Sequence, residues 1–460
     1  MTSAPYRVQP TPTFRDPAGS LTIEDDRAVR RIHPEAREAV LEFVNSPFYK
    51  RVVDRGDMVA TSVDEAPAAV RLIHPRIPVP TYPWEWTQSQ WLAAAELTVA
   101  LGKEALADGW ILKDATPLNI LFVGHRPILV DVLSFERRDP ASSIWLAYGQ
   151  YTRTFLLPLV MSSLMSWPLA LTLFKRDGYE PLELYRVMNW RQRLSPLAFW
   201  SITLPTWLDK RSAPATATQP RKQDPELTAH ILKGTLTGLL RRTRRAVPRD
   251  HASSWSDYQT TLSHYTPDQS ERKRQWVKAV FDDLHPHTVL DIGANTGEFS
   301  ALAAATGAQV IALERDSASA DRLFLSSRNW NLDIQTIHAD LARPTPPAGW
   351  ENGESSGLLS RLEAHCELLM MLAVIHHLIL MEQIPLAAIL ALCHRLARRH
   401  LIVEWVPVTD PMFQSLMRGR DSLYGSLTEA DLLHACAGRF KPVRQETLGN
   451  GRILFLFEKL

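Results

Sequence analysis

The sequence has few cysteines, almost no net charge and no apolar leader, and each of these shortages excludes a class of protein. Three cysteines in 460 residues are too few, and odd in number, for a disulfide framework, which indicates a reducing compartment. The 51 basic and 50 acidic side chains nearly cancel, so no general attraction to nucleic acid is expected. Residues 1–17 lack the apolar core of a signal peptide. We therefore expect a cytoplasmic protein that has no nucleic-acid partner.

The remaining composition is that of a globular protein with more than one domain. Hydrophobic residues make up 45% and charged residues 22%, and the length suggests two or three domains. Residues 209–226 are polar and rich in Pro, Ala and Thr, which indicates a linker. We predict an N-terminal domain over 1–208, a linker and basic helix over 209–254, and a C-terminal domain over 255–460. Nine of the 14 tryptophans precede residue 210, where core packing or sugar stacking would use them.

Two segments raise the question of membrane contact. Residues 155–174 carry no charge and are long enough to span a bilayer, but they contain Pro158, Pro168 and four Ser or Thr. A buried helical hairpin or a surface-associated segment is favoured. The helical pattern that follows the linker holds five arginines between Arg241 and Arg249, and we interpret it as a solvated connecting helix. Membrane association through these two segments stays an alternative that we do not favour.

The strongest motif is TVLDIGANTGEFS, at residues 288–300. A short apolar strand leads into Asp291, Gly293, Asn295 and Gly297, and a helical pattern begins directly afterwards. Glycines at a strand-to-helix turn let the backbone approach a ligand closely, and the helix N-terminus attracts anions. The spacing G-x-x-x-G differs from the G-x-G-x-x-G of dinucleotide-binding proteins. The motif therefore predicts a ligand-binding turn of another kind.

Acidic side chains follow the later apolar runs in the same half. Glu314 ends the run over 309–313, Asp340 ends the run IQTIHAD, and Glu404 ends the run HLIVEWVP. In open α/β sheets, ligands bind at the carboxyl ends of the strands. The pattern predicts a doubly wound α/β domain with a mostly parallel sheet and a binding site at that edge.

Four of these segments, in this order, resemble the motifs of class I S-adenosylmethionine-dependent methyltransferases: VLDIGANTGEF, IALERD, IHAD and ELLMMLAVIHHL. The resemblance implies a Rossmann-like domain with S-adenosylmethionine as cofactor and no metal. It assigns the methionine half of the donor to Asp291, Gly293 and Gly297, the ribose to Glu314, the adenine to Asp340, and further donor contacts to Asn295 and Glu367.

A narrower resemblance covers most of the chain. SHYTPDQSERKRQWVKAVF before the glycine motif and IVEWVPVTDPMFQSLMRGR after the fifth strand are similar to the nodulation-type methyltransferases related to NoeA. This resemblance implies a glycan or lipo-oligosaccharide acceptor. The absence of an N-P-P-[YF] motif argues for an oxygen or carbon acceptor on a small molecule or glycan. His376 and His377 are candidate bases, with Glu404 as an alternative, while a pair of histidines that only caps the strand is the structural alternative.

The N-terminal half contains the pattern D-x-x-P-x-N at Asp114, Pro117 and Asn119, followed by two apolar runs and Asp131. This pattern resembles the catalytic loop and metal-binding strand of the aminoglycoside- and choline-kinase-like phosphotransferases. The resemblance implies an α+β domain that holds ATP and Mg²⁺ at Asp114, Asn119 and Asp131. Lys113 replaces the usual residue before the aspartate, and residues 30–75 lack a glycine-rich loop. The N-terminal half is therefore interpreted either as a degenerate kinase-like domain or as an acceptor-recognition domain, and the sequence does not decide between the two.

The leading hypothesis is a methyltransferase whose C-terminal half binds the donor and whose N-terminal half helps to select the acceptor. A bifunctional kinase–methyltransferase is the second hypothesis. A non-enzymatic protein that retains a donor pocket is the third.

Overall fold

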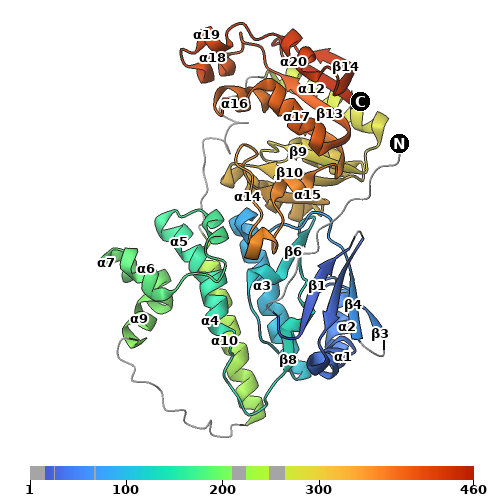
Figure 1. Cartoon of the computed structure of the whole chain (residues 1–460). Coiled ribbons are helices and arrows are strands. Elements are labelled where there is room, and N and C mark those ends of the chain that lie inside the picture. Colours follow the sequence, from blue (N-terminus) through green and yellow to red (C-terminus); the bar gives the residue numbers. More distant parts are fainter. Residues whose placement is uncertain (1–15, 25, 67–68, 210–223, 248–264) are drawn as a thin grey trace. The chain divides into compact units, whose positions relative to one another are not determined.

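The computed structural model describes residues 16–24, 26–66, 69–209, 224–247 and 265–460 (Figure 1). The chain divides into two compact units. Unit 1 comprises Met1–Phe122, Pro127–Asp250 and Ala348–Ser355, and unit 2 comprises Val123–Arg126, His251–Pro347 and Ser356–Leu460. Most of the predicted linker lies outside the described residues.

Unit 1 begins with a four-stranded antiparallel sheet of order β1-β2-β4-β3. Its strands are β1 (Gly19–Ile23), β2 (Arg27–Ile32), β3 (Ser62–Ala66) and β4 (Ala69–Pro75), and helices α1 (Arg37–Val44) and α2 (Pro47–Asp54) lie between β2 and β3 in the chain. In β2, Val29, Arg30 and Ile32 are buried, so an arginine enters the interior with the apolar side chains. That arginine contacts one of the predicted site residues, as described below.

The long helix α3 (Gln88–Ala105) is the centre of unit 1. It begins at Thr87, whose hydroxyl accepts from the Gln90 backbone N–H while the Gln90 side chain accepts from Thr87 N–H. Two short pairs of strands follow: β5 (Trp110–Leu112) with β8 (Phe135–Arg137), and β6 (Ile120–Val123) with β7 (Arg126–Leu129). The loop before β6 carries Asp114, and the residue Asp131 follows β7. The chain therefore brings the predicted kinase-like residues near one end of these strands.

The uncharged segment 155–174 forms two separate helical pieces. Helix α5 (Leu157–Met165) ends where Ser166 adopts a left-handed φ of 55°, and η7 (Leu169–Leu173) follows Pro168. Phe155 through Met161 are buried, so this segment contributes to the core of unit 1. Among the described residues, no helix combines the length and the apolar character needed to cross a membrane.

The basic segment forms α10 (Pro225–Ala246), and this helix differs from the predicted solvated connector. Its Leu232, Leu236 and Leu239 are buried, and it packs against α3, where a side chain added at Gly102 would meet Leu236. The leucines recur at helical spacing and therefore form one apolar face, which buries that side of the helix. The helix is part of the packed core of unit 1.

Unit 1 also contains a group of short helices, drawn in green in Figure 1. They are α4 (Tyr148–Tyr151), α6 (Pro181–Val187), α7 (Trp190–Arg193), α8 (Pro196–Ala198), η8 (Phe199–Thr203) and α9 (Leu204–Asp209).

Unit 2 is built on a seven-stranded sheet of order β11-β10-β9-β12-β13-β15-β14. The strands are β9 (Thr288–Ile292), β10 (Gln309–Glu314), β11 (Ile334–His338), β12 (Cys366–Met371), β13 (Ala397–Trp405), β14 (Phe440–Thr447) and β15 (Ile453–Lys459). The first five in this order run parallel, and β15 is antiparallel to both β13 and β14. The predicted α/β fold with a mostly parallel sheet is confirmed. The order reverses between β9 and β12, which is where ligands bind in sheets of this kind.

Helix α12 (Pro267–Leu284) precedes the first strand of unit 2. The helices between its parallel strands are α13 (Glu298–Ala305), α14 (Ser317–Trp330), α15 (Leu358–Leu362), α16 (Ile375–Leu380) and α17 (Leu386–Leu396). Three more lie between β13 and β14: α18 (Pro411–Met417), α19 (Asp421–Tyr424) and α20 (Glu429–Cys436). Strands β9 to β13 and β15 are largely buried, as expected for a sheet covered on both faces, whereas the edge strand β14 is mostly exposed. One core cluster joins Val280 and Phe281 of α12 to Val289 and Met370 of the sheet. This core holds the strand ends, and hence the site, in fixed positions.

Candidate functional site

A cavity of about 480 Å³ opens at the carboxyl ends of β9, β10, β11 and β12 in unit 2. This volume lies in the range of small-molecule and cofactor sites. Its lining includes Asp291, Gly293, Asn295, Glu314 and Asp340, all of which the sequence analysis selected. Tertiary structure thus brings five predicted site residues, spread over 50 positions of the sequence, to one cavity.

The turn after β9 depends on glycine. Gly293 has a φ of 74°, and a Cβ placed there would lie 2.5 Å from Cγ2 of Val374, which also lines the cavity. Gly297 has a φ of 91°, but its nearest obstacle would be Leu323 of α14, 2.1 Å away. It does not appear among the cavity-lining residues. Gly293 therefore lets the chain pass beside the ligand space, whereas Gly297 lets α13 pack against α14.

Asp291 lies at the floor of the cavity and is almost entirely buried. Its Oδ2 accepts a hydrogen bond of 2.6 Å from the Ser300 hydroxyl. Burial raises the pKa of Asp291 to about 7, an effect that the Ser300 hydrogen bond and the charge of Lys273 partly offset and the nearby Glu314 charge reinforces. The ionisation of this carboxyl is therefore balanced near neutral pH and responds to any positive charge placed in the cavity.

Glu314 ends β10 and is held by two backbone amides. The N–H of Asn295 donates to Oε2 and the N–H of Asp316 donates to Oε1, both at 2.7 Å. Burial raises its pKa, and these hydrogen bonds act against the rise. Each carboxylate oxygen retains a lone pair, so the fixed group can still accept from two vicinal hydroxyls.

Three buried polar atoms of cavity-lining residues have no hydrogen-bond partner in the part of the chain that the structure describes. They are Oδ1 of Asn295, Oγ of Ser319 and Nη2 of Arg452. Asn295 adopts a φ of 50°, which is uncommon for a residue with a side chain. Buried polar groups are usually paired, so these atoms mark positions where a ligand would supply the missing partner.

Asp340 lines the cavity two residues after the end of β11. Its Oδ1 accepts from the N–H of Ala342 at 2.9 Å and its Oδ2 accepts from Arg343 at 3.0 Å. Arg343 continues to Glu382, which also pairs with Arg315. This chain of charges fixes the rim of the cavity from three separate segments.

The two predicted histidines occupy different places. His377 lines the cavity, whereas His376 is buried and does not line it. Their ring centroids are 4.1 Å apart. Burial, with a contribution from the charges of Arg315 and Arg452, lowers the pKa of His377 to about 4. At neutral pH the imidazole of His377 is therefore uncharged, and it is the member of the pair that a bound molecule could reach.

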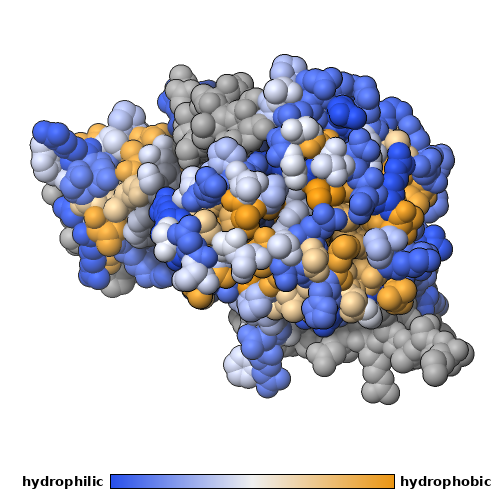
Figure 2. Space-filling model, turned by 90° about the horizontal axis from the view of Figure 1, so that it is seen from above, coloured by the Kyte–Doolittle hydropathy of each residue, from blue (hydrophilic) through white to orange (hydrophobic). Residues whose placement is uncertain are grey.

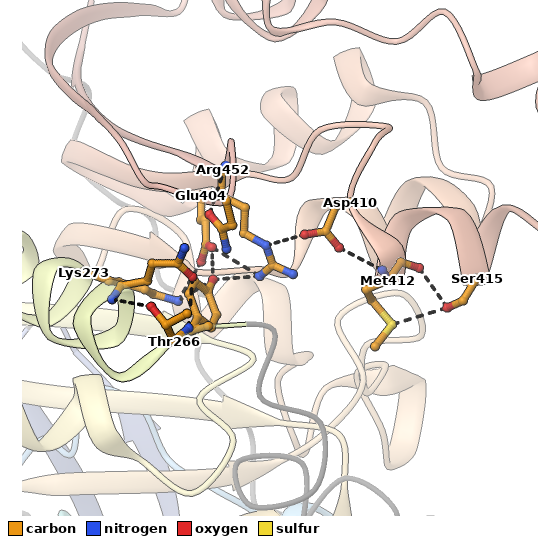
Figure 3. A network of polar contacts seen from close by, with 10 residues as sticks. Thr266, Lys273, Glu404, Asp410, Met412, Ser415 and Arg452 are labelled. Atoms are coloured by element: carbon orange, nitrogen blue, oxygen red, sulfur yellow. Dashed lines mark hydrogen bonds and ion pairs between the residues drawn. The ribbon is translucent and has the colours of Figure 1, made fainter.

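Glu404 is the centre of a buried polar network (Figure 3). Lys273 donates to its Oε2 at 2.6 Å, while Tyr265 and Arg452 contact Oε1. Arg452 also donates to Asp410 at 2.8 Å. Burial alone would raise the pKa of Glu404, but the charges of Lys273 and Arg452 hold it below its ordinary value.

Glu404 does not line the cavity, and a carboxylate engaged in this way is a poor proton acceptor. The network instead presents Tyr265, Lys273 and Arg452 to the cavity. The geometry therefore favours a positioning role for Glu404 over the predicted role as an alternative base.

Glu367 is placed differently from its prediction as a donor contact. It is the second residue of β12, at the amino end of the strand, and its Oε2 accepts from the N–H of His287 at 2.9 Å. The cavity lies at the opposite, carboxyl end, where Leu372, Ala373 and Val374 follow β12. The error arose because the strand is six residues long, so a residue near its start lies on the other edge of the sheet.

The predicted kinase-like residues of unit 1 form a compact hydrogen-bonded cluster. Asn119 donates to the Ser134 hydroxyl at 2.9 Å, and that hydroxyl donates to Oδ2 of Asp131 at 2.5 Å. Oδ1 of Asp131 pairs with Arg30 of β2 at 2.9 Å. The cation that contacts Asp131 is therefore a guanidinium, and a Mg²⁺ ion would have to displace it.

Asp114 lies beside this cluster. Burial, together with the charge of Asp131, raises its pKa. Gln150, whose side chain accepts from the N–H of Ala115 at 2.6 Å, contacts it as well. The cluster has the hydrogen-bond pattern of a structural turn as much as that of a catalytic loop.

Comparison with known proteins gives one full-length relative. No family model matches the chain. The chain is 27% identical to the nodulation protein NoeA of Rhizobium meliloti (strain 1021) over 469 residues, which cover 97% of this chain and 95% of that protein. The predicted resemblance to the NoeA-like group is confirmed.

Solved structures match parts of the chain at low similarity. Magnesium protoporphyrin IX methyltransferase from Synechocystis PCC 6803 is 16% identical, covers 49% of this chain and 95% of its own, and has a TM-score of 0.31. The N-methyltransferase NodS from Bradyrhizobium japonicum WM9 is 13% identical, covers 42% of this chain and 97% of its own, and also has a TM-score of 0.31.

Sequence reasoning missed several residues at the cavity. Lys273 lines it from α12, Tyr265 from the residues just before α12, and Ser319 from α14. Arg452 reaches it from the turn before β15. The segment around Lys273 contributed to the prediction only through its resemblance to NoeA-like proteins. A lysine on an otherwise amphipathic helix carries no signal by itself, because its burial depends on a glutamate 131 positions away.

Proposed function

We propose that this protein is an S-adenosylmethionine-dependent methyltransferase. The observation that carries the proposal is the single cavity in which Asp291, Gly293, Glu314 and Asp340 meet at the carboxyl ends of three adjacent strands. The NoeA-like similarity over nearly the whole chain, together with the ordered motifs, supports the same donor.

The residues present fit such a donor. Glu314 is fixed by two amides with lone pairs left for ribose hydroxyls, and Asp340 faces the adenine end. Asn295 and Ser319 hold unpartnered buried atoms at the cavity. Asp291 is poised to ionise near neutral pH, which suits a ligand that carries positive charge. The bound donor would supply a methyl group on a sulfonium for direct transfer.

The chain's own contribution would be orientation and control of a proton. In-line transfer needs the two reactants held in line, which fixed carboxylates and a rigid turn provide. A hydroxyl acceptor also needs somewhere for its proton to go. Neutral His377 lines the same space as Arg452 and Lys273 and can accept a hydrogen bond from that hydroxyl. Because the pKa of His377 is about 4, its role as the base depends on a bound donor and acceptor raising that pKa.

The acceptor that we propose is a small molecule or a glycan, including a lipo-oligosaccharide, methylated at oxygen or carbon. This choice is supported by the similarity to NoeA and by the missing N-P-P-[YF] motif. Unit 1 would then help to select the acceptor.

Phosphoryl transfer by unit 1 is the less favoured alternative, because Arg30 pairs with Asp131 and the Ser134 hydroxyl bonds to the same carboxylate. The residues as arranged do not fit ATP with Mg²⁺. A non-enzymatic donor-binding protein would bind the donor equally well, so only the formation of a methylated product distinguishes this alternative from the main proposal.

The test is calorimetric titration of the full chain with S-adenosylmethionine, followed by a screen of glycan and small-molecule acceptors with a methyl-labelled donor. We expect saturable binding and transfer of label to at least one acceptor. Absence of donor binding to the folded protein would refute the proposal, and binding without any labelled product would favour the non-enzymatic alternative.

A further inference from the structure

A helical lobe of unit 1, residues 181–209, exposes an unusual concentration of large apolar side chains. The lobe comprises α6, α7, α8, η8 and α9, drawn in green in Figure 1. Its large exposed apolar residues are Val187, Trp190, Leu194, Trp200, Trp207 and Leu208. Three of the tryptophans that the sequence concentrates before residue 210 are thus on the surface, outside the core. Exposed apolar groups at this density mark an interaction surface.

The exposed aromatic residues form a continuous cluster. Phe199 contacts Trp200 and Trp207, with ring centroids 5.4 and 6.0 Å apart. The Trp207 indole N–H donates to the Tyr185 hydroxyl at 3.1 Å, and Arg193 stacks over the Tyr185 ring at 4.1 Å. These contacts hold the indoles in place, so the surface is formed before any partner binds.

Trp190 extends this surface on α7. Its side chain is 66% exposed, and Arg191 lies over its ring at 5.2 Å. The Thr203 hydroxyl donates to the Arg193 carbonyl at 2.7 Å, which ties α7 to the aromatic cluster on η8 and α9. Hence Trp190, Trp200 and Trp207 belong to one small structural element.

Arginines border the apolar surface. Arg186 and Arg191 are exposed on either side of Trp190, and Arg193 follows. The acidic residues of the lobe are Glu183, which is already paired with Lys175 at 2.9 Å, and Asp209 at its end. Three arginines against these two carboxylates leave the lobe with a net positive charge. At the left of Figure 2, where this lobe projects, apolar orange patches border on hydrophilic blue residues.

We propose that the lobe 181–209 is a membrane-docking surface that binds the interface of a bilayer containing anionic lipids. Tryptophans prefer the headgroup level of a membrane, where the ring is in an apolar layer and the indole N–H meets polar groups. Arginines beside them gain from the negative surface potential of anionic lipids. A second copy of the chain would bring the same arginines against one another, so self-association lacks this charge complementarity.

The proposal differs from the membrane contacts considered from the sequence. Residues 155–161 are buried, and α10 packs its leucine face against α3. The lobe lies between these two segments in the chain and was not selected, because its apolar residues alternate with polar ones. It is independent of the proposed methyl transfer.

The test is sedimentation of the full chain with vesicles of phosphatidylcholine, alone or mixed with phosphatidylglycerol. We expect binding to the mixed vesicles and weaker binding to phosphatidylcholine alone. The double substitution Trp190→Ala/Trp200→Ala should lower the partition coefficient by roughly tenfold or more, since it removes the two most exposed side chains among the large apolar residues of the lobe. Arg186→Gln/Arg191→Gln should weaken binding to the mixed vesicles only.

The matched control is Trp330→Ala/Trp350→Ala, which removes two tryptophans of equal exposure, 67% and 62%, outside the lobe. This variant should bind as the wild type does. Thermal unfolding of each variant verifies that it is folded. The proposal is overturned if the wild type binds neither vesicle, if both double variants lose binding equally, or if light scattering shows a dimer that only the lobe variant dissociates.

Discussion

The two units each gather carboxylates that the sequence marked as functional, yet they leave them in opposite states. In unit 2, Asp291 and Glu314 are fixed by a hydroxyl or by amides and still face a cavity. In unit 1, Asp131 is neutralised by Arg30 and bonded to Ser134. The difference teaches that a carboxylate's availability depends on what the rest of the fold places against it. A cationic side chain neutralises the carboxylate. Neutral hydrogen-bond donors fix its position but leave its negative charge available to a positively charged ligand.

The largest effect on donor affinity is expected at Gly293, because the carboxylates of unit 2 can meet a ligand only while the cavity beside this glycine stays open. Gly293→Val adds atoms where even a Cβ would lie 2.5 Å from Val374, so donor affinity should fall by about a hundredfold or more, measured by calorimetry. Gly307→Val is the control, because Gly307 has a similar left-handed φ of 91° but no heavy atom within 4 Å. If both variants lose donor binding equally, backbone strain alone explains the result.

Glu404 tests whether unit 2 also contains a satisfied carboxylate. Glu404→Gln leaves Lys273 buried without its anion and removes one of the two carboxylates that pair with Arg452, so it should lower the free energy of unfolding by about 3–5 kcal/mol at pH 7. Because the folded-state pKa of Glu404 is lowered, this stabilisation is present above the ordinary glutamate pKa of about 4.3 and is lost as the pH falls further. Denaturant unfolding checks both points. Glu458→Gln, an exposed change on neighbouring β15, should shift stability by less than about 0.5 kcal/mol.

Asp131 tests the opposite side of the comparison. Asp131→Asn removes the nearer of the two carboxylates that pair with Arg30 and should lower the free energy of unfolding by about 1–3 kcal/mol while donor affinity stays unchanged. Thermal shift with ATP and Mg²⁺ provides the critical measurement. A Mg²⁺-dependent stabilisation of the wild type that Asp131→Asn abolishes would show that the guanidinium yields to a metal, and the comparison would fail.

Asp291 gives the smallest effect and the most specific one. Its pKa of about 7 means that it is partly protonated at neutral pH, and a positively charged donor favours the ionised form. Donor affinity should therefore rise as the pH increases through about 7, by up to about tenfold per pH unit below it. Calorimetry across this range should find no such rise for Asp291→Asn.

Ser300→Ala sharpens the same test. It removes the hydrogen bond that opposes the effect of burial on Asp291, so the rise in affinity should move to higher pH. A pH profile that is identical in Ser300→Ala and the wild type would assign the titration to another group.

The local sequence pattern was sufficient to predict those elements whose defining residues are close together in the chain. The glycine turn after β9, the acidic ends of β10 and β11 and the mostly parallel sheet followed from periodicity and spacing. Glu367 was misplaced because a run of apolar residues does not reveal where its strand begins. His376 and His377 could not be separated, because adjacent residues differ in direction only once the helix α16 is packed.

The sequence by itself determined the α/β class of unit 2, the resemblance to NoeA-like proteins and the carboxylates at the strand ends, since each depends on neighbours in the chain. Only the tertiary structure decided which of these carboxylates face a cavity. Lys273 and Glu404 are 131 positions apart. Arg30 lies on β2, whereas Asp131 lies in the loop after β7. Burial and ion pairing depend on distances in space, so no local pattern contains them.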